Sequence, residues 1–119
     1  MVFDLIVSSG RGGVVIVAVI GELDISTAPK LRQQLIQAIA DLGPSPKIVL
    51  DLAGTDYLDS TGLGVILGGV KRTRLQGGDL ALTGAEPQVR RDFEITRLIE
   101  VLPIYESIDA AIDALLVEG

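Results

Sequence analysis

The sequence predicts an α/β fold, with one domain over residues 1–119, a mixed β-sheet and about four α-helices. Three observations predict it. Short β-branched apolar runs alternate along the chain with segments whose apolar residues recur at helical spacing. Hydrophobic residues make up 48% of the chain but aromatics only 3%, so Val, Ile, Leu and Ala must build the core, which suits strands buried on both faces. A length of 119 residues fits a single core.

The first two strands are expected to form an antiparallel hairpin. Residues Val2–Ser8 partly alternate between apolar and polar, and Val14–Ile20 are apolar and mostly β-branched. Gly10–Gly13 lie between them as a turn signal, because glycine accepts positive φ angles. A link this short joins strands that pair antiparallel.

The first helix is predicted from the apolar spacing that follows. Ser26 or Thr27 is expected to cap its start, Pro29 is tolerated in its first turn, and Gly43 followed by Pro44 ends it. The apolar positions at helical spacing are Leu31, Leu35, Ala38, Ile39 and Leu42.

The rest of the chain repeats the alternation of strand and helix, which predicts parallel pairing. Strands are expected at Lys47–Leu52 and 80–84, and a short edge strand within 100–105, where Pro103 limits pairing. A helix over 86–99 should turn Val89 and Phe93 inward. Two further helices are marked by their apolar residues, which are Leu63, Ile66, Leu67 and Val70 in one and Ile108, Ala111, Ile112, Leu115 and Leu116 in the other.

Composition excludes several classes of function. The formal net charge of −6 argues against nucleic acid and anionic membranes as partners. With neither Cys nor His, the chain has no disulfide, no thiolate or histidine catalysis and no cysteine zinc site, so we expect no enzymatic activity, metal or cofactor. The longest apolar run, Val14–Ile20, is far shorter than a membrane-spanning helix, and no signal peptide opens the chain. A soluble cytoplasmic protein without direct membrane insertion is expected.

The segment Tyr57–Gly69, YLDSTGLGVILGG, carries the most informative polar residues. It begins in a loop at the carboxyl end of a predicted strand, the edge where function collects in open α/β sheets. Asp59 or Ser60 can cap the helix that follows. Ser60 can also be a phosphate acceptor, because a helix N-terminus favours negative charge. A nucleophilic hydrolase is disfavoured, because the G-x-S-x-G motif and a general base are both missing.

Two glycines in the same segment suggest close packing. Gly62 and Gly64 fall in the first turns of the predicted helix, where glycine is about 1 kcal/mol worse than alanine. We therefore expect a backbone to approach them closely, either from the adjoining loop or from a partner protein.

Acidic and basic groups leave two further alternatives open. Asp24, Asp51, Asp56 and Asp59 would suit a receiver-like magnesium site if they gathered at one edge, but Asp24 and Asp51 are better explained as residues that organise loops. The basic run at 71–74, together with Arg90 and Arg91, is best explained by helix ends and solvent exposure. Contact with an acidic patch on a partner is the alternative.

Three segments in order carry a resemblance to a known family. They are GELDISTAPKLRQQL at 21–35, IVLDLAGTDYLDSTGLGVILGGVKR at 48–72 and GGDLALTGAEPQVRRDFEITRLIEVLPIYES at 77–107. Together they resemble the STAS domain family, and in particular the bacterial anti-sigma factor antagonists, over roughly residues 14–116. The D-S-T-G-L-G core is short but specific when it follows an apolar strand that ends in D-L.

The resemblance implies a function and its residues. It places the family's phosphorylated serine on Ser60, and the two loops around it form the surface that binds an anti-sigma factor, which is also a serine kinase holding ATP and magnesium. The implied partner-binding residues are Asp24, Thr27, Asp59, Ser60, Thr61, Gly62 and Leu63. A separate phosphoserine phosphatase would reset the switch. We expect a monomer, because partner exchange needs an exposed edge.

A rival interpretation keeps the fold and changes the role. STAS domains also serve as scaffold subunits of stress-sensing assemblies and as regulatory subunits of membrane transport systems, and a fold does not settle function. The intact Ser60 favours the antagonist.

Overall fold

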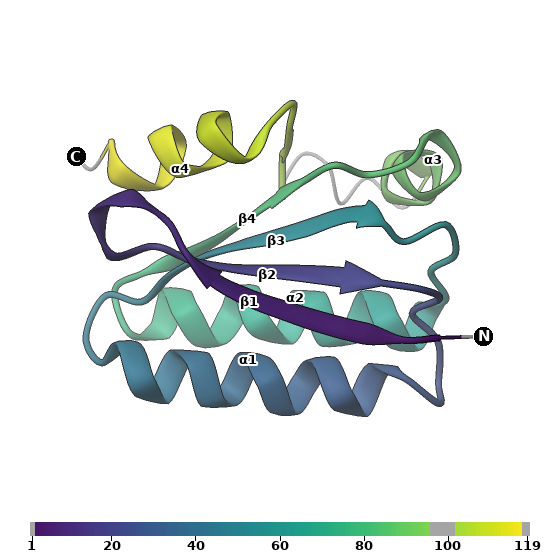
Figure 1. Cartoon of the computed structure of the whole chain (residues 1–119), viewed down its shortest axis with the longest axis horizontal. Coiled ribbons are helices and arrows are strands. Elements are labelled where there is room, and N and C mark those ends of the chain that lie inside the picture. The colour runs from purple at the N-terminus through teal and green to yellow at the C-terminus, as the bar shows by residue number, and fades with distance from the viewer. Residues whose placement is uncertain (1, 96–101, 118–119) are drawn as a thin grey trace.

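The computed structural model describes residues 2–95 and 102–117, and each structural statement below refers to these ranges. The predicted order of strands and helices is confirmed (Figure 1). The elements are β1 (Asp4–Ser9), a 3-10 turn η1 (Arg11–Gly13), β2 (Val15–Ile20), α1 (Ala28–Leu42), β3 (Lys47–Gly54), α2 (Ser60–Leu75), β4 (Asp79–Thr83), α3 (Pro87–Ile95), β5 (Ile104–Tyr105) and α4 (Ile108–Leu116).

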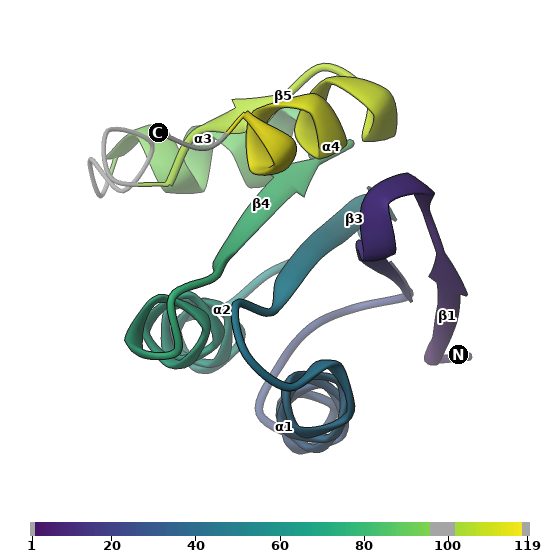
Figure 2. The same ribbon diagram turned by 90° about the vertical axis from the view of Figure 1, so that its left-hand side faces the viewer.

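The five strands form one sheet in the order β1-β2-β3-β4-β5, and the predicted mixed pairing is confirmed. β1 and β2 pair antiparallel, with Ile6 opposite Ala18, and each later strand pairs parallel with the one before it. Helices α1 and α2 cover one face of the sheet and α4 lies on the other (Figure 2). The carboxyl ends of the parallel strands therefore meet at one edge, where the loops after β2 and β3 emerge.

The central strand β3 shows why its sequence is apolar at successive positions. Ile48, Leu50 and Leu52 face the cluster beneath α1 and α2, whereas Val49 faces the cluster beneath α4. All four side chains are fully buried, because both faces of this strand are covered by helices. Phe93 is the one aromatic side chain that is fully buried in the described ranges, so aliphatic side chains build the rest of the core there.

Several boundaries differ from the expected ones, and β2 and β4 do so by a single residue, since they span Val15–Ile20 and Asp79–Thr83. β1 begins at Asp4 rather than Val2, because its pairing with β2 starts where Asp4 lies opposite Ile20. β3 continues to Gly54, since β2 pairs with it beyond an irregularity, with Ile20 opposite Gly54. α3 spans Pro87–Ile95, and the rest of the helix expected to end at 99 lies outside the described residues.

The predicted cap of α1 is confirmed in its position but wrong in its side-chain hydrogen bond. Thr27 occupies the N-cap position, but its φ and ψ of −105° and −25° are already helical, and neither it nor Ser26 caps the helix with a side chain. The Thr27 hydroxyl instead accepts from the Asp24 N–H at 2.9 Å and donates to the Glu22 carbonyl at 2.8 Å. Pro29 in the first turn and the end at Gly43 are confirmed.

The buried face of α2 differs in part from the apolar pattern. Ile66 and Val70 are buried as expected, but Leu63 and Leu67 are only half-buried. Small residues take the remaining inner positions. At Gly69, a Cβ atom would lie 3.0 Å from Leu35 Cδ1, so glycine lets α1 pack closely against α2. No helix within 2–95 and 102–117 is both long and apolar enough to cross a membrane.

Candidate functional site

The loops after β2 and β3 are joined by backbone hydrogen bonds. The Leu23 N–H donates to the Tyr57 carbonyl at 3.0 Å, and the Asp59 N–H donates to the Leu23 carbonyl at 3.1 Å. Leu23 and Leu58 form a parallel bridge, and both side chains are buried. The structure thus brings the predicted residues of the first loop beside those at the start of α2.

Asp59 is the N-cap of α2. It has the extended φ and ψ of a capping residue, −102° and −178°, and its Oδ1 accepts from the Gly62 N–H at 2.9 Å. Its carbonyl accepts the first bond of the helix, from the Leu63 N–H at 3.0 Å. Of the two predicted caps, Asp59 is therefore confirmed and Ser60 is wrong.

Ser60 is left free by this arrangement. It is the first residue of α2 and is exposed to solvent. Its hydroxyl has no hydrogen-bond partner among residues 2–95 and 102–117. Thr61 is also exposed. The helix start combines partly positive N–H groups with a hydroxyl that no structural bond holds, and such a position accommodates added negative charge.

The close approach predicted at Gly62 is confirmed, and the approaching backbone belongs to the adjoining loop. A Cβ atom at Gly62 would lie 2.9 Å from the Leu23 carbonyl oxygen and 2.8 Å from Leu23 Cγ. Gly64 differs, because no described atom outside its chain neighbours and the adjacent backbone of its own helix comes within 4 Å of a Cβ built there. The loop therefore does not explain Gly64, and a partner's approach there stays a prediction.

Asp24 organises the first loop, as expected. Its Oδ1 accepts from the Ser26 N–H at 2.9 Å, from the Ser26 hydroxyl at 2.7 Å and from the Thr27 N–H at 3.2 Å. These bonds, the one from the Ser26 hydroxyl first, lower the pKa of Asp24 below its ordinary value. Asp51 has the same kind of role, since its Oδ1 accepts from the Ala53 N–H at 3.0 Å.

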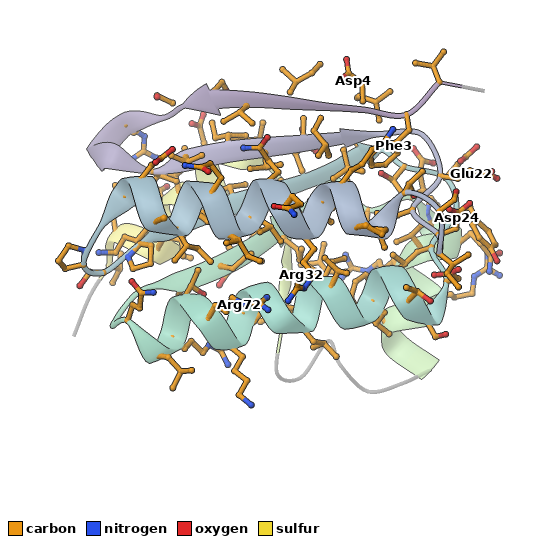
Figure 3. All side chains as sticks on the ribbon, turned by 90° about the horizontal axis from the view of Figure 1, so that it is seen from below. Phe3, Asp4, Glu22, Asp24, Arg32 and Arg72 are labelled. Atoms are coloured by element: carbon orange, nitrogen blue, oxygen red, sulfur yellow. The ribbon has the colours of Figure 1, made fainter. Side chains whose placement is uncertain are left out.

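The acidic residues do not assemble into a metal site. No group of three or more Asp or Glu side chains is arranged to hold a metal ion in the part of the chain that the structure describes. Figure 3 shows Glu22 and Asp24 at one end of the molecule, where the loop after β2 emerges. They give this edge a negative rim rather than a cation cage.

Sequence reasoning missed two kinds of residue at this edge. Ile25 and Tyr57 are 73% and 49% exposed and place apolar surface on the two joined loops. The signal was an apolar residue within a polar loop, between Asp24 and Ser26. Thr55 is fully buried, and its hydroxyl donates to the Val19 carbonyl at 3.0 Å, which anchors the second loop to β2.

Comparison with known proteins decides the family. The STAS domain model matches residues 6–111, which is most of the chain. The chain belongs to the STAS domain family. Among its relatives, the anti-sigma F factor antagonist of Paenibacillus polymyxa is 39% identical over 95 residues, which is 80% of each chain. The anti-sigma-B factor antagonist of Bacillus subtilis is 39% identical over 88 residues, which is 74% of this chain and 78% of the relative.

A solved STAS structure agrees with the fold over nearly the whole chain. The crystal structure of an anti-sigma factor antagonist from Mycobacterium paratuberculosis superposes with a TM-score of 0.83 at 30% identity. The superposition covers 96% of this chain and 94% of the Mycobacterium paratuberculosis chain. The family resemblance and the mixed sheet expected from the sequence are therefore confirmed.

Proposed function

We propose that this chain is an anti-sigma factor antagonist controlled by phosphorylation of Ser60. In its unphosphorylated form it binds an anti-sigma factor that is also a serine kinase, and so frees a sigma factor in the cytoplasm. Phosphorylation of Ser60 ends that binding, and a phosphoserine phosphatase restores it. Relatives that are 39% identical and named as antagonists support the class of function.

One observation carries the assignment of Ser60. Asp59 makes the helix cap, so the exposed Ser60 hydroxyl has no structural task among the described residues. A kinase can modify this hydroxyl without breaking a bond that holds the fold. The proposed binding surface consists of the two joined loops and the start of α2, with Asp24, Thr27, Asp59, Ser60, Thr61, Gly62 and Leu63.

The chemistry belongs to the partner. The kinase holds ATP and magnesium, and the Ser60 oxygen attacks the γ-phosphorus. A new oxygen–phosphorus bond forms, the bond to the β-phosphate oxygen breaks, ADP leaves, and the hydroxyl proton passes to a base on the kinase. The antagonist supplies the acceptor and its position, and needs no catalytic group of its own.

The phosphate then acts by local electrostatics. It adds about −1.5 to −2 charges beside Asp59, on an edge that already carries Glu22 and Asp24. In an interface shaped for a hydroxyl, an unpaired desolvated charge costs several kcal/mol. A loss of about 4 kcal/mol lowers the affinity roughly a thousandfold, which releases the antagonist without a change of fold.

The first test is to locate the phosphate. The purified chain is incubated with the anti-sigma factor kinase of its source organism and ATP, and peptides are mapped by mass spectrometry. One phosphate on Ser60 is expected. Thr61 is the internal control, because it is an exposed hydroxyl one residue along. Phosphate on Thr61 in place of Ser60 contradicts the assignment.

The same experiment separates the antagonist from its rival. A scaffold or a regulatory subunit of a transport system does not need to be released by ATP. Stable binding of the wild type to the kinase in the presence of ATP, with no phosphate on either hydroxyl, would favour that rival role.

A further inference from the structure

Charge is unevenly distributed between the helices and the rest of the chain. Helices α1 and α2 contain five basic residues and one acidic residue, so this layer has a formal charge of +4 in a chain of −6. The acidic residue is Asp41, and the basic ones are Lys30, Arg32, Lys71, Arg72 and Arg74. The layer is therefore an attractive surface for negative charge, although the whole molecule is acidic.

Two arginines face each other across this layer. Figure 3 shows Arg32 of α1 and Arg72 of α2 pointing toward one another along the line where the two helices meet, which we call the arginine seam. Gly68 helps to set this geometry, because a Cβ built there would lie 3.2 Å from Arg72 Nη1. The guanidinium group of Arg72 can thus lie close against its own helix.

Neither arginine has a carboxylate partner within residues 2–95 and 102–117. The contrast with other arginines is clear, since Arg11 pairs with Asp113 and Arg74 pairs with Asp79 at 3.0 Å. Two like charges that converge without a counter-charge repel each other. A carboxylate between them would remove this repulsion and accept hydrogen bonds from both guanidinium groups.

Helix stability does not explain the seam. Arg72 lies in the last turn of α2, where the helix dipole favours a cation. Arg32 is the fifth residue of α1, beyond the first turn and far from the C-terminus, so the dipole gives its charge no favourable interaction. Arg32 is also exposed, so packing does not require its charge.

We propose that the arginine seam binds an acidic segment of the same anti-sigma factor that contacts Ser60. This inference rests on the proposed function and adds the partner's charge and orientation to it. α2 begins at Ser60 and reaches Arg72 after 12 residues, about 18 Å along the helix axis. An interface of ordinary size, about 800 Å² on each partner, is large enough to include both Ser60 and Arg72.

The two charged regions fix how the partner lies. The rim near Ser60 is negative, because Asp59 caps α2 and Glu22 and Asp24 lie at this end of the molecule (Figure 3), whereas the seam is positive. A partner that covers both must present basic groups to the rim and acidic groups to the seam. Such complementarity acts mainly on the rate of association and on the choice of partner.

The test compares association rates of single-charge variants with the anti-sigma factor kinase. Arg32→Gln and Arg72→Gln are expected to associate about threefold or more slowly at low ionic strength, and to approach the wild-type rate in about 1 M salt. Arg11→Gln is the matched control, because it removes the same charge from an exposed position in the β1–β2 turn. Equal slowing in all three variants would show that only net charge matters, and would overturn the proposal.

Further arms keep this proposal distinct from the proposed function. Ser60→Asp tests only the switch. If Ser60→Asp binds the kinase weakly while both arginine variants associate at the wild-type rate, the seam is refuted and the proposed function stands. If no kinase binds, titration with a short polyglutamate peptide by NMR tests the seam directly, and shifts of the Arg32 and Arg72 Nε–H signals no larger than that of Arg11 refute it. Arginine-dependent binding to phosphatidylserine vesicles, with kinase association unchanged, would assign the seam to a membrane instead.

Discussion

Asp59 and Ser60 are adjacent at the start of α2, but their side chains contribute differently to the stability of the fold. The Asp59 side chain accepts from the Gly62 N–H, while the Ser60 hydroxyl makes no hydrogen bond within the described ranges. Asp59→Ala should therefore lower the free energy of unfolding by about 0.5–2 kcal/mol, as loss of an N-cap does. Ser60→Ala should change it by no more than about 0.5 kcal/mol. Urea unfolding of the two variants measures both free energies of unfolding. If Ser60→Ala loses as much stability as Asp59→Ala, the assignment of the cap to Asp59 alone is contradicted.

Asp24 offers a second prediction for a single residue. The Ser26 hydroxyl is the main cause of its lowered pKa, so Ser26→Ala should raise that pKa toward the ordinary value of about 3.9. Because the folded pKa is depressed, the stabilisation is present above the unfolded pKa and is lost as the pH falls through the folded pKa. The stabilisation of the loop by Asp24 should accordingly be independent of pH between about pH 5 and 8, and should be lost only below about pH 4. The carboxyl carbon shift of Asp24 against pH reports this, and identical midpoints in both proteins would contradict it.

The helix α2 contains a matched pair of glycines. A Cβ at Gly62 would meet the Leu23 carbonyl oxygen at 2.9 Å, so Gly62→Ala should destabilise the protein by about 1–3 kcal/mol. Gly64 has open space, so Gly64→Ala should stabilise it by up to about 1 kcal/mol through helix propensity. Thermal or urea unfolding compares them directly. If Gly64→Ala weakens kinase binding while stabilising the fold, a partner approaches there.

The strands and helices could be predicted because each has its own local pattern. The apolar run of β3 and the spacing of Ala111, Ile112 and Leu115 in α4 point to buried faces without reference to the rest of the chain. The inner face of α2 could not be predicted this way. Gly69 and Thr73 are buried there because α1 and β4 pack closely, and small residues give no apolar signal.

The candidate site could be predicted in part. The specific D-S-T-G-L-G core indicated Ser60, and its position after a strand indicated the edge of the sheet. The choice between Asp59 and Ser60 as the cap depends on backbone angles, because both residue types cap helices well. The convergence of Arg32 and Arg72 depends on how two helices lie side by side, which neither helix encodes alone.

At the scale of the whole molecule, we expect one added charge to change the partner without changing the fold. Helices cover both faces of the sheet, and the loops after β2 and β3 are joined to each other by the backbone hydrogen bonds of Leu23. Ser60→Asp should consequently keep the wild-type backbone and bind the kinase weakly, although one carboxylate imitates a phosphate imperfectly. Backbone amide NMR spectra check the fold, and shifts confined to the start of α2 and the neighbouring loops are expected.

The most direct measurement of the central claim is release of the antagonist from its kinase on addition of ATP. Wild type and Ser60→Ala are bound to the kinase, ATP and magnesium are added, and the fraction that remains bound is followed over time. Wild type should dissociate as phosphate appears, with affinity falling roughly a thousandfold. Ser60→Ala should fold, bind and stay bound. Complete ATP-driven release of Ser60→Ala would contradict the account, because the switch would then not depend on Ser60.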